Sequence, residues 1–512
     1  MRSIEYFSMS KPRRMLYSVG VGFKNFFLGI GNFFAKIPLK LWSFLKKIAR
    51  PFIVMFDALF HGDWKTRLSF ILFGFGHLTR NNILRGILYL AFQISFVLFI
   101  VFVGAPNLSK LGTLGRIGVV KVEDPFWGVE VPMIFDNSFE ILLYSIFSCI
   151  LILVACFVYY SSVAGAFKLQ LDDACGKLGN EKEFLHKLVG KNYHVPLLTI
   201  PLLGIAIFTL IPILFMVLIA FTNYNSYHLT PQNLIDWVGM RNFVNIFGNN
   251  SSGSGVLFLK TFLEVLLWTL VWAFFSTFSN YFLGMIIAIV INTKGIKFKK
   301  VWRTILITTI AVPQFVSLLL INRMLQTDTG AVNAWLTSLN LITTNIKWLN
   351  QRYLTHAVII IINTWIGVPY TMLICTGILM NIPTDLYESA KIDGASPTKM
   401  YMKITLPYML FVTTPYLISQ FVGNINNFNV IYLLSSGSPL YTFTDPNVPQ
   451  QLSGLGQTDL LITWIYKICL TNAHRDYGTA SVLSIMIFVI VAFFSLLAFT
   501  RSKSIKNEED FQ

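Results

Sequence analysis

Neutral polar side chains lie beside aromatic rings within several long apolar stretches of this chain. Residues 363–370 read NTWIGVPY, and residues 424–429 contain four asparagines. Gln314 adds another amide beside a helix-breaking proline. Amides exchange hydrogen bonds with hydroxyl groups, and aromatic rings cover the apolar faces of sugar rings. These residue types suit a neutral, hydroxyl-rich ligand, and hydrogen bonding between helices accounts for them equally well.

A polar segment between two apolar runs, residues 383–407, predicts two short helices. Asp385 with a glutamate three residues later fits a capping box, so a helix should begin there. Gly394 is placed to end that helix in the left-handed conformation, and Ser-Pro at 396–397 predicts a second N-cap. We expect Pro407 to stop the second helix. A polar helix–turn–helix of this kind is well shaped to dock a soluble partner.

The sequence contains no recognisable set of catalytic or metal-binding residues. It has no Gly-x-x-x-x-Gly-Lys-Ser/Thr loop, so ATP hydrolysis would require another chain. The seven histidines are scattered, and the five cysteines have no metal-ligand spacing. We therefore expect no catalytic residues, no metal ligands and no cofactor in this chain.

The composition excludes a soluble globular protein. Hydrophobic residues make up 54% of the chain and charged residues only 12%. No segment has the alternation typical of a membrane barrel, so we predict an all-α integral membrane protein. The stretches apolar enough to be transmembrane helices number about eight: 86–103, 139–163, 196–221, 265–290, 304–322, 356–380, 408–423 and 479–499.

The net charge of +16 reflects membrane topology. Of the 40 lysine and arginine residues, 30 fall on one side if the loops alternate across eight spans. The positive-inside rule then places both termini in the cytoplasm of a multi-pass plasma-membrane protein. The polar segment 383–407 lies on the same side. No basic patch on a soluble fold is visible, so nucleic acid is not an expected partner.

Residues 1–82 form a basic region ahead of the first span. Phenylalanines recur at helical spacing over 23–48, but lysines interrupt the run too often for a span. We predict amphipathic helices on the membrane surface, attracted by anionic lipid, and a docking arm for a partner subunit is the alternative. Residues 1–22 lack the apolar core of a cleavable signal peptide. The expected division is 1–82, then 83–194 with two transmembrane helices, then a core of 195–512.

The segment 383–407 resembles the coupling loop of ABC importer permeases. That pattern is Glu-Ala-Ala, three residues, Gly, nine residues and Ile-x-Leu-Pro, and Ser389 replaces its first alanine. The resemblance implies an ABC importer permease fold in which this loop transmits movement from an ATPase subunit. The residues that it assigns to coupling are Asp385, Glu388, Ser389, Ala390, Gly394, Ile404, Leu406 and Pro407.

The segments 363–370 and 424–428 resemble the larger, MalF-like permease subunit of maltose and maltodextrin importers, in particular the Gram-positive type. In that family the larger subunit holds the sugar in mid-membrane. Gln314 and Gly423 depart from the family pattern, which has a serine and a phenylalanine there. The substrate-binding residues implied by the resemblance are Gln314, Asn363, Ile366, Gly367, Tyr370, Gly423, Asn424 and Asn427.

The same resemblance implies the partners of this chain. They are a second permease subunit, two ATPase subunits that hold ATP and Mg²⁺, an extracellular sugar-binding lipoprotein, a neutral oligosaccharide and membrane lipid. The implied mechanism is alternating access, in which ATP closes the ATPase subunits and the sugar site opens outward.

Several alternatives remain open at this stage. The substrate could be another neutral oligosaccharide, such as a raffinose-type or galactan-derived sugar, or a glycerol phosphate. An ion-coupled secondary carrier would need intramembrane carboxylates or a similar relay, and several spans have no ionisable residue in their cores. A structural scaffold without a substrate path would explain the spans but not the polar segment 383–407.

Overall fold

The computed structural model describes residues 50–501, apart from 124–125, 177–185, 187–188, 249–253, 294 and 444–447. The phenylalanine-rich helix predicted over 23–48 lies outside the described residues. The chain forms two compact units. The N-terminal unit comprises the described parts of Met1–Gly112 and Glu140–Ile211, and the C-terminal unit those of Thr113–Phe139 and Pro212–Gln512. The expected division at 82 and 194 remains a prediction.

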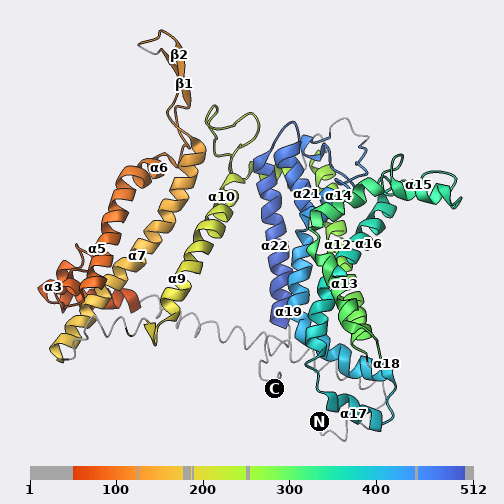
Figure 1. Ribbon diagram of the computed structural model, residues 1–512. Coiled ribbons are helices and arrows are strands. Elements are labelled where there is room, and N and C mark those ends of the chain that lie inside the picture. Colours follow the sequence, from red (N-terminus) through yellow and green to blue (C-terminus); the bar gives the residue numbers. More distant parts are fainter. Residues whose placement is uncertain are drawn as a thin grey trace, which may run out of the picture. The chain divides into compact units, whose positions relative to one another are not determined.

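The described part of the N-terminal unit contains three long helical stretches (α5–η1–α6, α7 and α9–η2), the short helices α3 and α4, and helical residues 50–60 (Figure 1). The long helices are apolar along most of their length, as membrane spans require. The elements are α3 (Trp64–Leu68), α4 (Phe75–Leu78), α5 (Ile83–Phe99), the π-helical turn η1 (Ile100–Gly104), α6 (Ala105–Lys110), α7 (Ser138–Ala174), α9 (His194–Ile205) and η2 (Ala206–Leu210).

A half-buried ion pair connects the short helices to α7. Asp63 caps α3 by accepting a hydrogen bond from the Thr66 amide at 2.9 Å. Both of its carboxylate oxygens lie 2.6 Å from the guanidinium of Arg80, which also donates to the Ala166 carbonyl in α7. The Gly74 amide donates to Ser162 of the same helix at 2.8 Å. These bonds hold α3 and α4 at one end of α7.

One short β-hairpin accompanies the helices in the described part of the chain. Strand β1 (Val119–Glu123) pairs antiparallel with β2 (Glu130–Ile134), with Val119 opposite Ile134. β-branched residues favour extended backbone, and Gly128 takes the positive φ of 58° between the strands. The hairpin lies in the loop between the first two spans, where the hydropathy pattern alone predicts no element.

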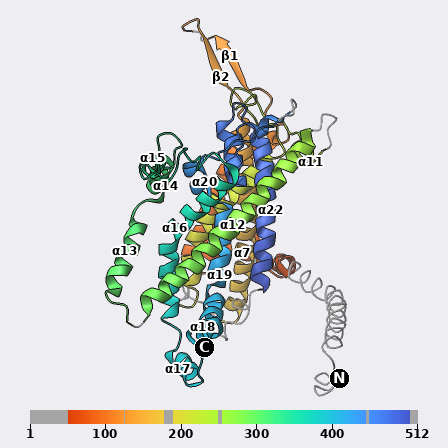
Figure 2. The same cartoon turned by 90° about the vertical axis from the view of Figure 1, so that its right-hand side faces the viewer.

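The C-terminal unit is organised around α12 (Ser254–Asn292), α16 (Arg352–Leu379) and α19 (Leu406–Ile425), with α22 (Tyr477–Arg501) beside them (Figures 1 and 2). Small residues let α12 and α16 approach closely, since a Cβ at Gly284 would lie 2.8 Å from Thr371 Cβ. Its other elements are α10 (Ile211–Ile219), α11 (Arg241–Phe247), α13 (Lys299–Ala311), α14 (Gln314–Met324), α15 (Ala331–Ser338), α17 (Thr384–Ile392), α18 (Pro397–Met400), η3 (Tyr401–Thr405), α20 (Phe428–Leu434), η4 (Gln450–Leu452), α21 (Leu461–Tyr466) and η5 (Lys467–Thr471).

The structure has helices at all eight expected spans, but they are not all simple spans. Within the described residues, six helices are long and apolar enough to cross a membrane alone. The span expected at 304–322 is the pair α13 and α14, bent by 85°. The span expected at 408–423 is α19, which is 20 residues long but less apolar because it carries threonine, glutamine and asparagine. The helical membrane class is therefore confirmed, with six or seven spans by these criteria.

Candidate functional site

A cavity of about 240 Å³ opens at the break between α13 and α14. Proline cannot donate a backbone hydrogen bond, and it drives the preceding residue out of the helical region. Val312 is accordingly extended, with ψ 122°, and Pro313 becomes the N-cap of α14. Helix α16 supplies the facing wall. Three of the eight predicted binding residues line this cavity: Gln314, Ile366 and Tyr370.

The lining of this cavity combines aromatic rings with neutral polar groups. Trp365 and Tyr370 of α16 both expose more than half of their surface. Gln314 contributes an amide, and Thr309 and Ser317 contribute hydroxyls. None of the residues that line the cavity is charged. Such a surface can cover a sugar ring and exchange hydrogen bonds with its hydroxyls, and it offers nothing to a strongly charged ligand.

Three other predicted residues, Asn363, Asn424 and Gly367, lie in contacts between helices. Asn363 is only 5% exposed, and its side-chain nitrogen has no hydrogen-bond partner within the described residues. Asn424 is also buried, and its amide donates to Thr277 of α12 at 3.0 Å. Gly367 faces α12 as well, because a Cβ there would collide with the side chain of Asn280. In this conformation these positions serve the packing between helices.

The last two predicted residues lie at the end of α19. The side chain of Asn427 accepts from the Val430 amide at 3.4 Å and so caps α20. It also donates to Asn424 Oδ1 at 3.4 Å. Gly423 is exposed, with open space around the position of a Cβ. The role of all eight residues in binding stays a prediction, because this conformation gathers only three of them.

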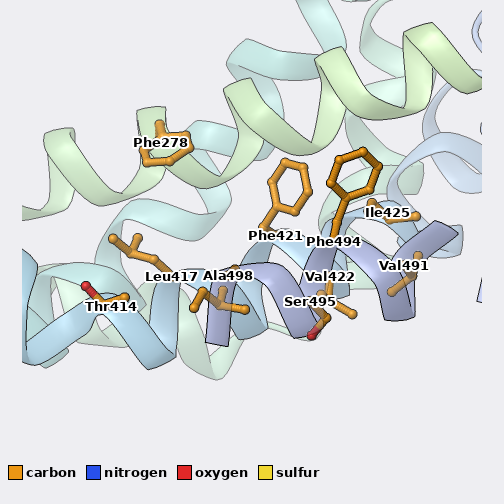
Figure 3. A pocket seen from close by; sticks show the side chains of 11 residues that line it. Phe278, Thr414, Leu417, Phe421, Val422, Ile425, Val491, Phe494, Ser495 and Ala498 are labelled. Atoms are coloured by element: carbon orange, nitrogen blue, oxygen red, sulfur yellow. The ribbon is translucent and has the colours of Figure 1, made fainter. Parts of the chain in front are cut away.

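A second cavity, of about 390 Å³, lies beside this end of α19 (Figure 3). Side chains from α12, α19 and α22 line it, and rings of Phe278, Phe421 and Phe494 surround it. Its polar groups are the hydroxyls of Thr414 and Ser495. An apolar space of this kind cannot satisfy the hydroxyls of a sugar, so the cavity at the α13–α14 break is the better candidate.

Polar residues of α12 form a cluster that the sequence analysis missed. Four of the five residues in 276–280 are polar, in the middle of a long apolar helix. The Ser279 hydroxyl lies 2.8 Å from the Thr364 hydroxyl of α16. Within the described residues, Ser276 Oγ and Asn280 Oδ1 have no hydrogen-bond partner. The signal was visible in the sequence, because polar residues inside a span are costly unless they face other helices.

The predicted helix–turn–helix is present at 384–400 (Figure 2). Gly394 follows the C-cap of α17 with φ +74°, and Ser396 caps α18 by accepting from the Lys399 amide at 3.3 Å. The Tyr387 hydroxyl lies 2.8 Å from Thr405 Oγ1 and ties α17 to η3. Ile392 is 87% exposed at the tip of this segment. Apolar side chains that are exposed singly do not define a binding surface, so docking of a partner on this segment stays a prediction.

Two details of this segment were predicted wrongly. The capping box is absent, since α17 begins at Thr384 with Pro383 as N-cap, and Asp385 lies in the first turn. Pro407 does not stop the second helix, because it lies in the first turn of α19. The preceding turn η3 is π-helical, and the Leu406 amide bonds to the carbonyl of Tyr401. The chain therefore continues as helix from α18 through η3 into α19.

The other residues assigned to coupling are spread over this continuous helix and α17. Glu388 and Ser389 are exposed, whereas Ala390 is half-buried. Ile404 and Leu406 are half-buried where the helix leaves the polar segment.

Comparison with known proteins identifies the family to which this architecture belongs. Residues 280–503 match the family model described as a binding-protein-dependent transport system inner membrane component. The galactooligosaccharides transport system permease protein GanP of Bacillus subtilis is 35% identical over 445 residues, which cover 85% of this chain and 96% of GanP. The chain belongs to this permease family. The predicted helical permease architecture, the membrane location and the absence of an enzymatic role are confirmed by this membership.

Two further proteins are similar to this permease. The maltodextrin transport system permease protein MdxF of Bacillus subtilis is 32% identical over 453 residues, which cover 87% of this chain and 97% of MdxF. A solved structure of a bacterial alginate ABC transporter, in complex with an alginate-bound periplasmic protein, is 21% identical with a TM-score of 0.47. The matched region covers 63% of this chain and 98% of the chain in the alginate transporter structure.

Proposed function

We propose that this permease carries a neutral oligosaccharide of the maltodextrin class through the membrane, driven by ATP hydrolysis on separate subunits. The observation that carries the proposal is the uncharged cavity in which Gln314, Trp365 and Tyr370 meet at the break of a membrane-spanning pair. Similarity to MdxF, a maltodextrin permease, supports the choice of sugar.

Unpaired polar groups between α12 and α16 support an alternating mechanism. Asn363 Nδ2, Asn280 Oδ1 and Ser276 Oγ are buried without hydrogen-bond partners in the described part of the chain. A buried polar group without a partner costs about 1–3 kcal/mol. A second conformation that exposes these groups to a sugar would remove that cost. In this proposal Asn363, Asn424 and Asn427 bind the substrate in that second conformation.

The segment 384–400 supports the proposed coupling to an ATPase. Its exposed apolar residues, Leu386 and Ile392, lie on a polar helix pair that projects from the ends of α16 and α19. We infer that one ATPase subunit holds this segment in a groove, and that a second permease subunit, a second ATPase and a sugar-binding lipoprotein complete the importer. ATP and Mg²⁺ then act on the ATPase subunits only.

A galactooligosaccharide is the second candidate substrate, because GanP is the relative with 35% identity. Polymers of glucose and of galactose differ in the orientation of their hydroxyls. They have the same charge and similar size, so the charge and size of the cavity do not favour one over the other. The two candidates are separated by competition.

The test is uptake of radiolabelled maltotriose by cells that contain the complete importer, with unlabelled maltodextrin, galactooligosaccharide, raffinose or glycerol phosphate in excess. We expect uptake that depends on this chain and is blocked by maltodextrin. Tyr370→Ala and Gln314→Ala should each raise the transport KM about tenfold, through loss of a ring contact or a hydrogen bond. Tyr353→Ala, an exposed tyrosine at the far end of α16, is the matched control.

Each outcome decides a separate point. Chain-dependent uptake of a labelled galactooligosaccharide without uptake of maltotriose would replace maltodextrin as the substrate and keep the cavity as the site. An unchanged KM in both Tyr370→Ala and Gln314→Ala would remove this cavity from the transport path. Chain-independent uptake with every subunit present would overturn the sugar assignment.

A further inference from the structure

The N-terminal unit contains a surface cavity of about 620 Å³ that the proposed transport path does not use. Residues of α5, α7 and the start of α9 line it. A hydrogen bond of 2.8 Å between Tyr89 and Ser161 joins α5 to α7 at its wall. The cavity is therefore bounded by helices that are held together, and its lining belongs to a single compact unit.

One part of this lining is basic. Arg85 of α5 and Lys168 of α7 both border the cavity, with the hydroxyls of Tyr89 and Ser161 nearby. None of the residues that line it is acidic. Two cations beside hydroxyl groups form a site for phosphate oxygens, which accept charge-assisted hydrogen bonds from both kinds of basic side chain.

The remainder of the lining is apolar and exposed. Leu88 is 60% exposed and Phe157 is 71% exposed. Both lie further into their membrane-spanning helices than the basic residues do, because Arg85 is near the start of α5 and Lys168 is near the end of α7. The cavity thus passes from a charged end, at the helix termini, to an apolar end along the spans. A ligand that matches it has an anionic head and an apolar tail.

We propose that this cavity binds one anionic phospholipid, with its phosphate between Arg85 and Lys168 and an acyl chain along Leu88 and Phe157. Basic cavities between transmembrane helices are suited to the head groups of acidic lipids. A soluble phosphate would satisfy the two cations but would leave the apolar half of the cavity uncovered. The lipid would join the ends of α5, α7 and α9 and so hold the N-terminal unit to one leaflet.

The test uses the complete importer reconstituted into nanodiscs of equal parts phosphatidylglycerol and phosphatidylcholine. After extraction in mild detergent, native mass spectrometry counts the lipids that stay bound. We expect the unaltered protein to retain one phosphatidylglycerol per copy of this chain in preference to phosphatidylcholine. Arg85→Gln with Lys168→Gln should reduce that retention, by roughly fivefold for each charge removed.

Two control variants separate charge at the cavity from charge elsewhere. Lys297→Gln with Lys300→Gln removes the same charge from exposed residues of the C-terminal unit and should leave retention unchanged. Arg85→Lys with Lys168→Arg keeps both charges and should retain the lipid. If the double glutamine variant does not assemble, Lys168→Gln alone serves, because that side chain is exposed.

Three results would overturn the proposal. Equal retention of the two lipids would show no preference for an anionic head group. Equal loss in the Lys297→Gln with Lys300→Gln control would show a general charge effect. Displacement of the bound lipid by an excess of inorganic phosphate would assign the site to a soluble anion. None of these results depends on which sugar the importer carries.

Discussion

The imidazole ring of His77 is buried, and this burial disfavours its protonation. Its side chain is fully buried in α4, and within the described residues neither ring nitrogen has a hydrogen-bond partner. Gly165 of α7 makes room for it, because a Cβ there would lie 2.7 Å from Nε2. Burial lowers the pKa of His77 from 6.5 to about 4, with smaller contributions from the positive charges of Arg85 and Arg80.

This lowered pKa predicts that the N-terminal unit loses stability in mild acid. Below pH 6.5 His77 is protonated in the unfolded chain, whereas in the folded chain it stays neutral down to about pH 4. Stability present above pH 6.5 is therefore lost as the pH falls toward 4, by roughly 3 kcal/mol in full. Hydrogen exchange of α4 in the intact complex, corrected for intrinsic rates, measures this loss between pH 7.5 and 4.5.

Two substitutions make this prediction specific to His77. His77→Gln should remove most of the pH dependence. His61→Gln, at an exposed histidine of the same unit, should leave it intact. An identical pH slope in His77→Gln and the unaltered protein would refute the assignment to this ring.

At the level of single residues, the sequence also predicted part of the candidate site. Gln314, Ile366 and Tyr370 share a cavity because Pro313 breaks one helix opposite the aromatic face of another. Asn363 and Asn424 were chosen by the same resemblance, yet both are buried. Residue type alone cannot separate an amide that faces a ligand from one that faces a neighbouring helix.

The turn between α17 and α18 depends on one backbone conformation. Gly394 has φ +74°, a region that costs an ordinary L-residue roughly 1–2 kcal/mol and that asparagine tolerates better. A Cβ there would meet no atom within 4 Å, so strain and not collision limits the choice of residue.

Gly394→Val should therefore distort the segment and uncouple transport, while Gly394→Asn should retain most of the activity. Sugar-stimulated ATPase activity and uptake in the reconstituted importer give the two readouts. We expect Gly394→Val to lose most of the stimulation at unchanged complex yield. Equal behaviour of the two variants would show that this turn does not transmit the movement.

Two helix boundaries were predicted correctly from local chemistry, whereas the equally local capping box at Asp385 was not. Gly394 and Ser396 adopt the predicted cap conformations, because a left-handed turn and an N-cap involve only neighbouring residues. Pro407 was misjudged, since its effect depends on the π-helical turn before it. The hairpin β1–β2 was missed although its valines favour extended backbone, because the prediction considered only stretches long enough to span a membrane.

For the whole molecule, hydropathy was enough to predict a helical membrane protein. It could not predict the division into two compact units, which depends on contacts between distant segments. It also represented the bent pair α13–α14 as one span. We propose eight crossings, with α13–α14 and α19 each counted once, so that both termini share one side, and the charge distribution predicts that this side is the cytoplasm.

This topology predicts that the hairpin and α17 lie on opposite sides of the membrane. Glu123→Cys in β1 should react with a membrane-impermeant maleimide in intact cells. Ser389→Cys in α17 should react only after the membrane is permeabilised. Labelling of the chain without either substitution gives the background from its five native cysteines. Reaction of both positions from the same side would contradict eight crossings.

The break at Pro313 has a chemical consequence beyond the bend. In an unbroken α-helix the amide of residue 313 would donate to the carbonyl of Thr309, and proline has no such hydrogen. Thr309 also borders the cavity. The main-chain oxygen of Thr309 therefore loses the hydrogen bond that residue 313 would supply in an unbroken helix. We predict that this oxygen is an acceptor for a ligand hydroxyl, one that replacing side chains at the cavity wall would not remove.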